Sequence, residues 1–183
     1  MKIAVCEYGA GNVRSVVAAF ERLGASARVT SSPADVAAAD LAVLPGVGAA
    51  GSAMDTLRER GLDTALRERV AAGGATLGIC LGLQLALDES EEDGGVPGLG
   101  IVPGRAVRLR AGRVPRIGWA EVEPDSETYY FAHSYAAETP AAVSRSEGIV
   151  AAAESGSFLG VQFHPEKSGA AGARFLARCL SRV

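Results

Sequence analysis

Short, mostly apolar runs of four to six residues, alternating with alanine-rich segments of helical period, restrict the fold of this chain more than any other feature. The runs cover residues 3–6, 41–45, 75–79 and 158–163. A strand that is apolar on both faces must be covered on both faces, as happens when helices flank a parallel sheet. The pattern therefore predicts an α/β fold, with a mostly parallel central sheet between two layers of helices.

The segments between these runs carry start and stop signals of helices. The signals predict helices over residues 12–23, 32–39, 53–60, 62–72 and 81–87, and a C-terminal helix with Phe175, Leu176, Cys179 and Leu180 on its apolar face. Gly24 ends the first helix, and Ser32 with Pro33 begins the second. Residues 88–100 have the acidic, glycine-rich composition of a surface loop, and residues 101–135 predict shorter strands as antiparallel additions to the sheet.

Length and charge limit the function. A chain of 183 residues has room for a single domain, residues 1–183, and not for a second catalytic domain. With 18 Lys and Arg against 21 Asp and Glu, it has no basic stretch that would follow nucleic acid. No apolar run is long enough for a signal peptide or a membrane span. We therefore expect a cytoplasmic protein with neither nucleic acid nor membrane as a partner.

Three cysteines with no CxxC spacing, beside only two histidines, support neither a disulfide framework nor a zinc site. We expect no metal. Cys6 and Cys179 lie in apolar patterns and are predicted to be core residues. Cys80 differs because it follows a predicted strand and precedes a predicted helix, although a buried core cysteine is the alternative there too.

Gly78 and Gly82 flank Cys80 in a G-x-C-x-G sequence that has the form of a nucleophile elbow. A strand-to-helix turn this tight strains the backbone of its central residue and leaves room only for small neighbours. It also puts the sulfur at a helix N-terminus, where free N–H groups favour the thiolate. The sequence therefore predicts Cys80 as a nucleophile.

A cysteine nucleophile needs a base, and the chain offers only His133 and His164. His164 precedes a proline, which favours extended backbone, and in an extended chain Glu166 lies on the same face as His164. Glu166 would then fix the tautomer and direction of the imidazole. Cys80, His164 and Glu166 are the predicted catalytic residues, and a His-Pro-Glu surface turn is the alternative for the last two.

Two glycine turns follow other predicted strands. Gly46-Val47-Gly48 ends the run at 41–45, at the sheet edge expected to hold Cys80, where its backbone would supply N–H donors for an oxyanion. A plain glycine turn is the alternative. Gly9-Ala10-Gly11 follows the first run, but Arg14 holds the place of the third glycine of a dinucleotide loop, so nucleotide binding is not favoured.

Together these segments resemble the class I glutamine amidotransferases, and among them the glutaminase subunits of imidazole glycerol phosphate synthase in histidine biosynthesis. The resemblance runs nearly from end to end of the chain and implies a flavodoxin-like three-layer sandwich. It rests on residues 8–16 (YGAGNVRSV), 44–48 (LPGVG), 78–85 (GICLGLQL), 116–119 (RIGW), 130–135 (YFAHSY) and 160–169 (GVQFHPEKSG).

The resemblance implies a hydrolase that converts L-glutamine to glutamate and ammonia without a cofactor. Cys80 would attack the side-chain carboxamide, and backbone N–H groups at Leu81 and near Val47 would hold the oxyanion. His164, oriented by Glu166, would protonate the departing ammonia. Water would then hydrolyse the thioester.

By the same resemblance, Gln84, Ser134 and Tyr135 would contact the bound glutamine. Gly46 and Gly48 would let the oxyanion turn move, and Gly48 would belong to the oxyanion site itself. We expect turnover to depend on a partner, because a flexible turn can rest with its N–H pointing away from the oxyanion.

The implied partner is a cyclase, a barrel protein that forms a heterodimer with such a subunit. It joins the ammonia to a ribotide, in a lyase reaction that gives imidazole glycerol phosphate and an aminoimidazole carboxamide ribotide. The surface facing it would include Asn12, Trp119, Tyr130 and Lys167. A core position for Trp119 and a solvated surface position for Lys167 are the alternatives. His133 is expected to contribute its backbone rather than its imidazole.

Two residues depart from the family pattern. Arg116 and Ile117 stand where the pattern Pro-His-Met-Gly-Trp has His and Met, and the segment between Trp119 and Tyr129 is short. Both changes are expected in regions that face the partner. Two other functions stay open: a glutaminase that serves a different ammonia acceptor, and a non-catalytic binding module of the same fold. The second is less favoured because no member of the Cys80, His164 and Glu166 set is missing.

Overall fold

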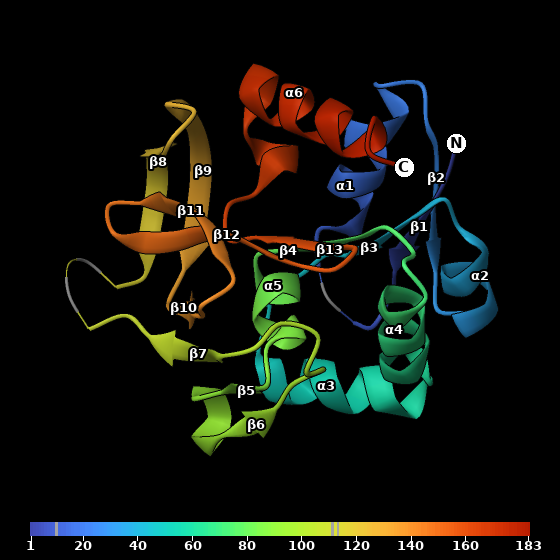
Figure 1. The fold of residues 1–183 in the computed structure, drawn as a ribbon, viewed down its shortest axis with the longest axis horizontal. Helices are drawn as coiled ribbons and strands as arrows, with labels where there is room; N and C mark the ends of the chain where they lie inside the picture. The colour runs from blue at the N-terminus through green and yellow to red at the C-terminus, as the bar shows by residue number, and fades with distance from the viewer. Residues whose placement is uncertain (10, 111, 113) are drawn as a thin grey trace.

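A seven-stranded sheet runs through the middle of the molecule in the computed structural model (Figure 1). The structure describes residues 1–9, 11–110, 112 and 114–183, so Ala10 of the Gly9-Ala10-Gly11 turn lies outside the described residues. Across the sheet the strands are β11 (Ala142–Ser146), β12 (Ile149–Ser155), β13 (Phe158–Val161), β4 (Thr76–Ile79), β3 (Leu41–Leu44), β1 (Lys2–Cys6) and β2 (Ser26–Thr30). The strands from β13 to β2 are parallel, and β12 and β11 continue the sheet antiparallel.

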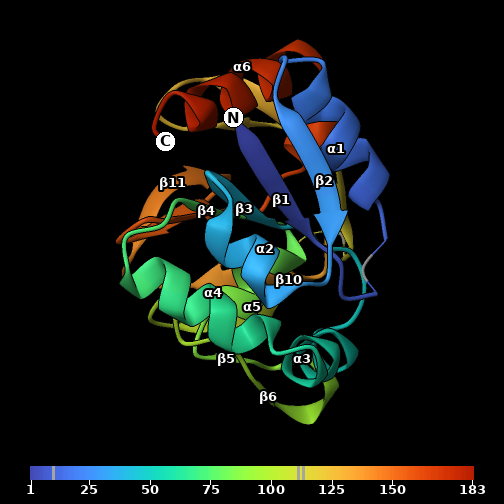
Figure 2. The ribbon, with the colours of Figure 1, turned by 90° about the vertical axis from the view of Figure 1, so that its right-hand side faces the viewer.

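Helices cover both faces of this sheet, as the apolar runs predict. Figure 2 shows α1 (Val13–Glu21) and α6 (Gly169–Leu180) on one side of the sheet. The other side holds α2 (Pro33–Ala38), α3 (Ala50–Glu59), α4 (Leu62–Ala71) and α5 (Leu81–Ala86). Among the described residues, none of the helices has the length and apolar content that crossing a membrane would take. The predicted α/β fold with a mostly parallel sheet is confirmed.

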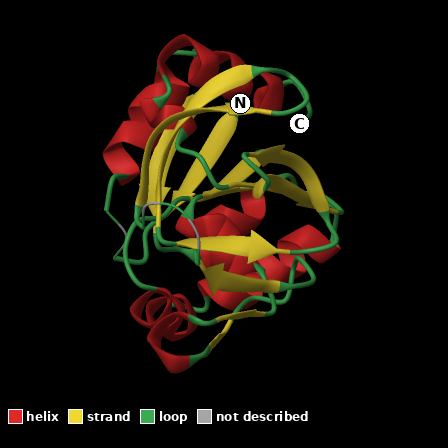
Figure 3. Cartoon of the chain, turned by 90° about the vertical axis from the view of Figure 1, so that its left-hand side faces the viewer, coloured by secondary structure: helices red, strands yellow, loops and turns green. Residues whose placement is uncertain are grey.

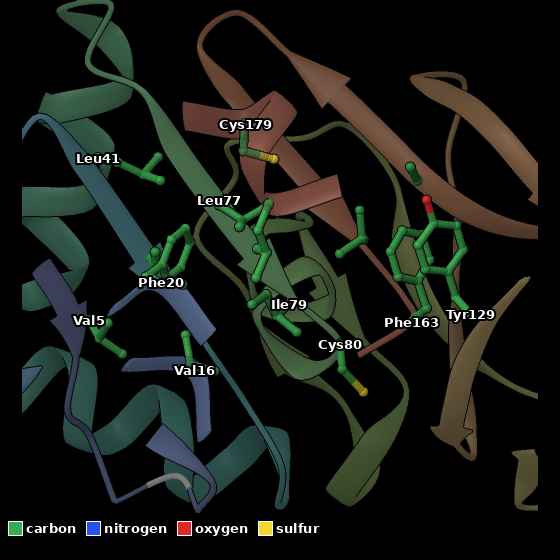
Figure 4. Close-up of a cluster of buried hydrophobic side chains, with 14 of the residues drawn as sticks. Val5, Val16, Phe20, Leu41, Leu77, Ile79, Cys80, Tyr129, Phe163 and Cys179 are labelled. Carbon is green, nitrogen blue, oxygen red and sulfur yellow. The ribbon is translucent and has the colours of Figure 1, made fainter. Parts of the chain in front are cut away.

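A buried parallel strand can supply two cores, because successive side chains point to opposite faces. In β3, Leu41 and Val43 pack with the α1 and α6 side, whereas Ala42 and Leu44 pack with the helices of the other side. Figure 4 shows the first core, in which Leu77 and Ile79 of β4 lead along the strand to Cys80 at its end. The continuous apolar runs are therefore the direct signature of strands buried on both faces.

Two smaller sheets hold the remaining strands and cover the end of the molecule that Figure 3 turns toward the viewer. One has the order β10 (Tyr135–Glu138), β7 (Arg105–Arg108), β5 (Glu89–Ser90) and β6 (Val96–Pro97); the other is the hairpin of β8 (Arg116–Val122) and β9 (Glu127–His133). The short strands expected between 101 and 135 are present, but they form these separate sheets. The strands that join the central sheet antiparallel are β11 and β12, which the apolar pattern of the sequence does not predict.

Two helix and loop boundaries differ from the prediction for one reason. The predicted surface loop 88–100 contains β5, β6 and the short 3-10 helix η1 (Glu92–Gly94), and it packs against the start of α3. The Glu92 carboxylate accepts a hydrogen bond from the backbone N–H of Ala50 at 2.8 Å, and the Asp93 carboxylate accepts one from Gly51 at 3.2 Å. These carboxylates cap α3, which begins at Ala50 rather than at residue 53.

The start of α5 packs closely against the backbone of β3, and this contact helps to position Cys80. A Cβ on Gly82 would overlap the carbonyl oxygen of Leu44. Only glycine lets α5 begin so close to the sheet, directly after Cys80. The second glycine of the G-x-C-x-G sequence is therefore required by packing as well as by the turn.

We expect Gly82→Ala to lower the free energy of unfolding by about 3 kcal/mol, because the added methyl group has only backbone to displace. Gly73→Ala is the control. Gly73 has a φ of 82° but nothing within 4 Å of an added Cβ, so we expect a loss of only about 1 kcal/mol from the left-handed backbone there. Urea denaturation of both variants measures the difference. Equal losses would contradict the close approach of α5 to β3.

Candidate active site

Cys80 occupies a strained turn between β4 and α5. Its backbone has a φ of 51° and a ψ of −104°, in a region that residues other than glycine rarely adopt. On the strand side, a Cβ on Gly78 would lie 2.6 Å from the Phe158 ring and 2.9 Å from the backbone of Gly82. The Cys80 N–H donates to the carbonyl oxygen of Val161 at 2.7 Å, which ties the turn to β13. The predicted elbow geometry is present.

The chain that continues from β13 places His164 and Glu166 side by side. His164 has extended backbone, with a φ of −103° and a ψ of 92°, before the 3-10 helix η2 (Pro165–Lys167). Its Nδ1 lies 2.8 Å from Glu166 Oε1, and each side chain is 1% exposed. The carboxylate can only accept, so Nδ1 carries the proton. The structure thus brings His164 and Glu166 together as a buried pair.

The surroundings of His164 keep its imidazole protonated over most of the accessible pH range. Burial, the largest single influence, lowers its pKa, but the neighbouring Cys80 sulfur and the Glu166 carboxylate outweigh it and raise the pKa of His164 from 6.5 to about 9. Its Nε2 is buried without a hydrogen-bond partner in the described part of the chain. That nitrogen therefore has its proton free for the neighbouring Cys80 sulfur.

Asn12 is a second hydrogen-bond partner of Glu166 Oε1. The Asn12 side-chain amide donates to Glu166 Oε1 at 2.7 Å, from a residue with a left-handed φ of 70° at the start of α1. Asn12 was predicted only as part of the partner-facing surface. The structure places its side chain on the carboxylate that orients His164.

A cavity of about 320 Å³ opens beside Cys80. It is lined by Val47, Gly48, Cys80, Leu81, Gln84, Glu92, Pro115, Ile117, Ala132, His133, Ser134 and Tyr135. Six residues predicted for the oxyanion or the substrate are in this lining. Gly46 is not; a Cβ there would lie 2.6 Å from Leu81 Cβ and 2.7 Å from the Tyr8 hydroxyl, so it is required for close packing under the turn.

Glu92 lines the cavity and was not predicted. Burial raises the pKa of its carboxyl group, which still accepts the hydrogen bond from Ala50. It is the only carboxylate in the lining of this cavity as described. The acidic run at 91–93 was a visible signal, but nothing local in the sequence shows that it folds back over Cys80.

His133 is also in the lining, with its imidazole buried. Its Nδ1 donates to the carbonyl oxygen of Tyr135 at 2.9 Å, since a carbonyl can only accept. Burial lowers the pKa of His133 from 6.5 to about 4, and the nearby charge of Arg116 adds to the effect. His133 is therefore neutral near pH 7, so the two histidines differ in charge.

Comparison with known proteins identifies the family. The model of the family "Glutamine amidotransferase class-I" matches residues 4–183. Two relatives carry the name imidazole glycerol phosphate synthase subunit HisH. The one from Methanothermobacter thermautotrophicus is 46% identical over 93% of this chain and 93% of its own length, and the one from Symbiobacterium thermophilum is 44% identical over 96% and 92%.

The chain belongs to the class I glutamine amidotransferase family. A solved glutamine amidotransferase has the same fold, with a TM-score of 0.83 and 21% identity over 98% of this chain and 97% of that chain. The structure of PurLQS from Thermotoga maritima also shares the fold, with a TM-score of 0.73 and 18% identity over 99% and 98%.

One face of the β8–β9 hairpin of this amidotransferase exposes large apolar side chains. Ile117 is 63% and Trp119 59% exposed, and the Trp119 ring meets Tyr130 edge-on with centroids 5.9 Å apart. A core position for Trp119 is thereby excluded. Lys167 is exposed on η2.

Arg116 points to the other face of the hairpin. Its side chain is 13% exposed, lies over the Phe131 ring at 4.2 Å, and donates to Ser146 Oγ and to Glu147 Oε2, each at 2.8 Å. The alternation along β8 turns the Arg116 side chain inward, so it does not lie on the exposed face that carries Trp119. Ile117, the next residue, is on the exposed face.

We expect Cys80→Ala to lower the pKa of His164 below about 9, because the sulfur is one of the two groups that raise it. His133 stays neutral down to about pH 4 in the wild type and in Cys80→Ala. Imidazole NMR titration measures both values, with Cys179→Ala as the control. An unchanged pKa of His164 in Cys80→Ala would contradict the proximity of the imidazole to the Cys80 sulfur.

The raised pKa of His164 also makes the stability of the fold depend on pH. Because the folded pKa exceeds the unfolded value of about 6.5, the charged imidazole stabilises the fold fully below that pH. This contribution is lost as the pH rises through about 9.

Proposed function

We propose that the chain is the glutaminase subunit of an imidazole glycerol phosphate synthase and releases ammonia from L-glutamine for histidine biosynthesis. The observation that carries the proposal is the strained Cys80 beside a buried His164–Glu166 pair, at the edge of a cavity of about 320 Å³. The names of the relatives from Methanothermobacter and Symbiobacterium support the choice of this synthase among the systems that use ammonia.

In the first half of the reaction the Cys80 thiolate attacks the carboxamide carbon of glutamine. The electron pair of the C=O bond moves to oxygen, and N–H groups of Leu81 and of the Val47–Gly48 turn stabilise the resulting oxyanion. His164 Nε2 then gives its proton to the leaving nitrogen. Ammonia departs and a thioester remains on Cys80.

In the second half a water molecule attacks the thioester carbon while His164 takes one of its protons. The C–S bond breaks, glutamate leaves, and the thiolate and the imidazolium are restored. Glu166 keeps Nδ1 protonated throughout, so that Nε2 is the nitrogen that exchanges protons.

The polar groups of the cavity suit the amino-acid end of glutamine. Both hydrogens of the Gln84 amide are used, since Nε2 donates to the Tyr135 carbonyl at 2.8 Å and to Gln162 Oε1 at 3.2 Å. Gln84 therefore meets the substrate as an acceptor. With the Glu92 carboxylate it faces the α-ammonium group, and Ser134 and Tyr135 contact the bound molecule from the other wall.

The ammonia passes to a barrel-shaped cyclase subunit bound as a heterodimer. The exposed apolar face of Ile117 and Trp119, with Tyr130 beside it, and the exposed charge of Lys167 support this surface as the one that meets the cyclase. Gly48 has a φ of 129° and no atom within 4 Å of an added Cβ, so the oxyanion turn has room to reorient when the partner binds.

We expect the purified protein to release glutamate slowly alone and much faster with the cognate cyclase and its ribotide. Cys80→Ala abolishes the release, whereas Cys179→Ala, a core substitution, leaves it near wild type. Glutamate formation is measured for each protein alone, with cyclase, and with cyclase plus ribotide. Equal activity without cyclase would overturn the partner dependence. Absence of activity in all three conditions would favour a different ammonia acceptor or a binding module.

We expect Asn12→Ala to lower kcat about tenfold with little change in KM, because the lost hydrogen bond holds Glu166 rather than the substrate. Ser15→Ala, an exposed change on the next turn of α1, is the control for the surface around Asn12. Steady-state kinetics in the presence of cyclase and ribotide separate the two constants. An unchanged kcat would show that Asn12 does not act through Glu166.

A further inference from the structure

Gln162 is fully buried between β13 and His164 and reaches the nucleophile. Its side-chain Nε2 donates to Cys80 Sγ at 3.5 Å. Its backbone N–H donates to Ala151 of β12 at 2.8 Å, so the residue is held by the sheet. A polar side chain with no exposure, aimed at the reacting sulfur, is costly to bury unless it is hydrogen-bonded there.

The orientation of the Gln162 amide follows from its neighbours. The Tyr135 carbonyl oxygen can only accept, so the Gln84 nitrogen must face it, at 2.8 Å. The same Gln84 nitrogen donates to Gln162 Oε1 at 3.2 Å. With its oxygen engaged there, the nitrogen of Gln162 must face the sulfur. Flipping the amide would set two nitrogens against each other and an oxygen against Sγ.

The contact of the Cys80 sulfur with the Ala132 carbonyl oxygen favours the thiol over the thiolate. Cys80 Sγ lies 3.9 Å from the Ala132 carbonyl oxygen, which accepts a hydrogen bond from the thiol and repels the thiolate. The Gln162 N–H stabilises the thiolate more than the thiol, because a hydrogen bond to a charged acceptor is the stronger one. Gln162 therefore opposes the effect of the Ala132 carbonyl.

We propose that Gln162 is a further catalytic residue, whose amide N–H stabilises and aims the Cys80 thiolate, and that Gln84 is the positioning residue that fixes that amide. The proposal rests on the proposed function, because it concerns the same nucleophile. It gives Gln84 a second role: its nitrogen sets the direction of the donor at the sulfur, while its oxygen remains for the substrate.

Two titratable groups act on the Cys80 sulfur, and two more line the same cavity; all four must be held constant in a test. His164 follows β13, Tyr8 follows β1, Glu92 is on η1 and His133 ends β9. Replacing Gln162 by an uncharged residue of similar length alters none of them. A difference between wild type and variant then reports the lost N–H donor.

The test is the pH dependence of Cys80 alkylation by iodoacetamide, followed by mass spectrometry of the peptide that contains Cys80. We expect the profiles of Gln162→Leu and Gln162→Met to lie about one pH unit above that of wild type, the size expected for one hydrogen bond to a charged group. Gln162→Met keeps an unbranched chain, and it serves if the leucine variant does not fold. Thr76→Val, which removes a buried hydroxyl at the far end of β4, should leave the profile unchanged.

The outcomes separate the two proposals. If the variants fold and their profiles superimpose on wild type, the role of Gln162 is overturned while the nucleophile stands. A shift of equal size in Thr76→Val would also overturn it, because the effect would then be a general loss of packing. If wild-type Cys80 is alkylated no faster than the buried Cys6 and Cys179, the proposed function itself fails.

Discussion

The parallel pairing of β4 with β13 is the constraint on which the site depends. It sets Ile79 beside Val161, so the residues that follow the two strands emerge together at one edge of the sheet. The Cys80 N–H bonds to the Val161 carbonyl, and this contact helps hold the nucleophile in a backbone conformation that is unfavourable by itself. Gln162 and His164 continue from the partner strand. One register thus places the nucleophile, its hydrogen-bond donor and its base.

The sequence determines these features to different degrees. The buried strands and the Cys80 turn are predictable because their signals are local: a continuous apolar run, or glycines around one cysteine. β2 was missed because most of its side chains are exposed, so it lacks an apolar run. β11 is half-exposed and so lacks an apolar run. β12 is rich in alanine, a residue that favours helices, so its sequence does not indicate a strand. Contacts such as Asn12 with Glu166, 154 residues apart, depend on how α1 packs beside η2 and have no local signal.

His133 and His164 show why residue type alone does not assign a role. Both imidazoles are buried, and burial acts on both in the same direction. The difference is the partner of Nδ1: a neutral carbonyl for His133 and a carboxylate for His164. At His164 the carboxylate and the nearby sulfur outweigh burial and favour the charged imidazole. At His133 burial prevails, because the hydrogen bond to the Tyr135 carbonyl raises the pKa too little to offset it, and the charge of Arg116 lowers the pKa further. Glu166, two residues along an extended chain, is thus the feature that separates the base from its neighbour.

The same contacts connect the exposed hairpin face to the base. The Tyr130 ring lies beside Trp119 on that face, while its backbone carbonyl accepts from the His164 N–H at 2.8 Å and its N–H donates to Ser168 Oγ at 3.0 Å. Ser168 in turn donates to the His164 carbonyl at 2.6 Å. The backbone of His164 is therefore fixed from both sides to the strand that carries the exposed ring. The hairpin that carries Trp119 and Tyr130 is therefore also the element that holds the backbone of His164.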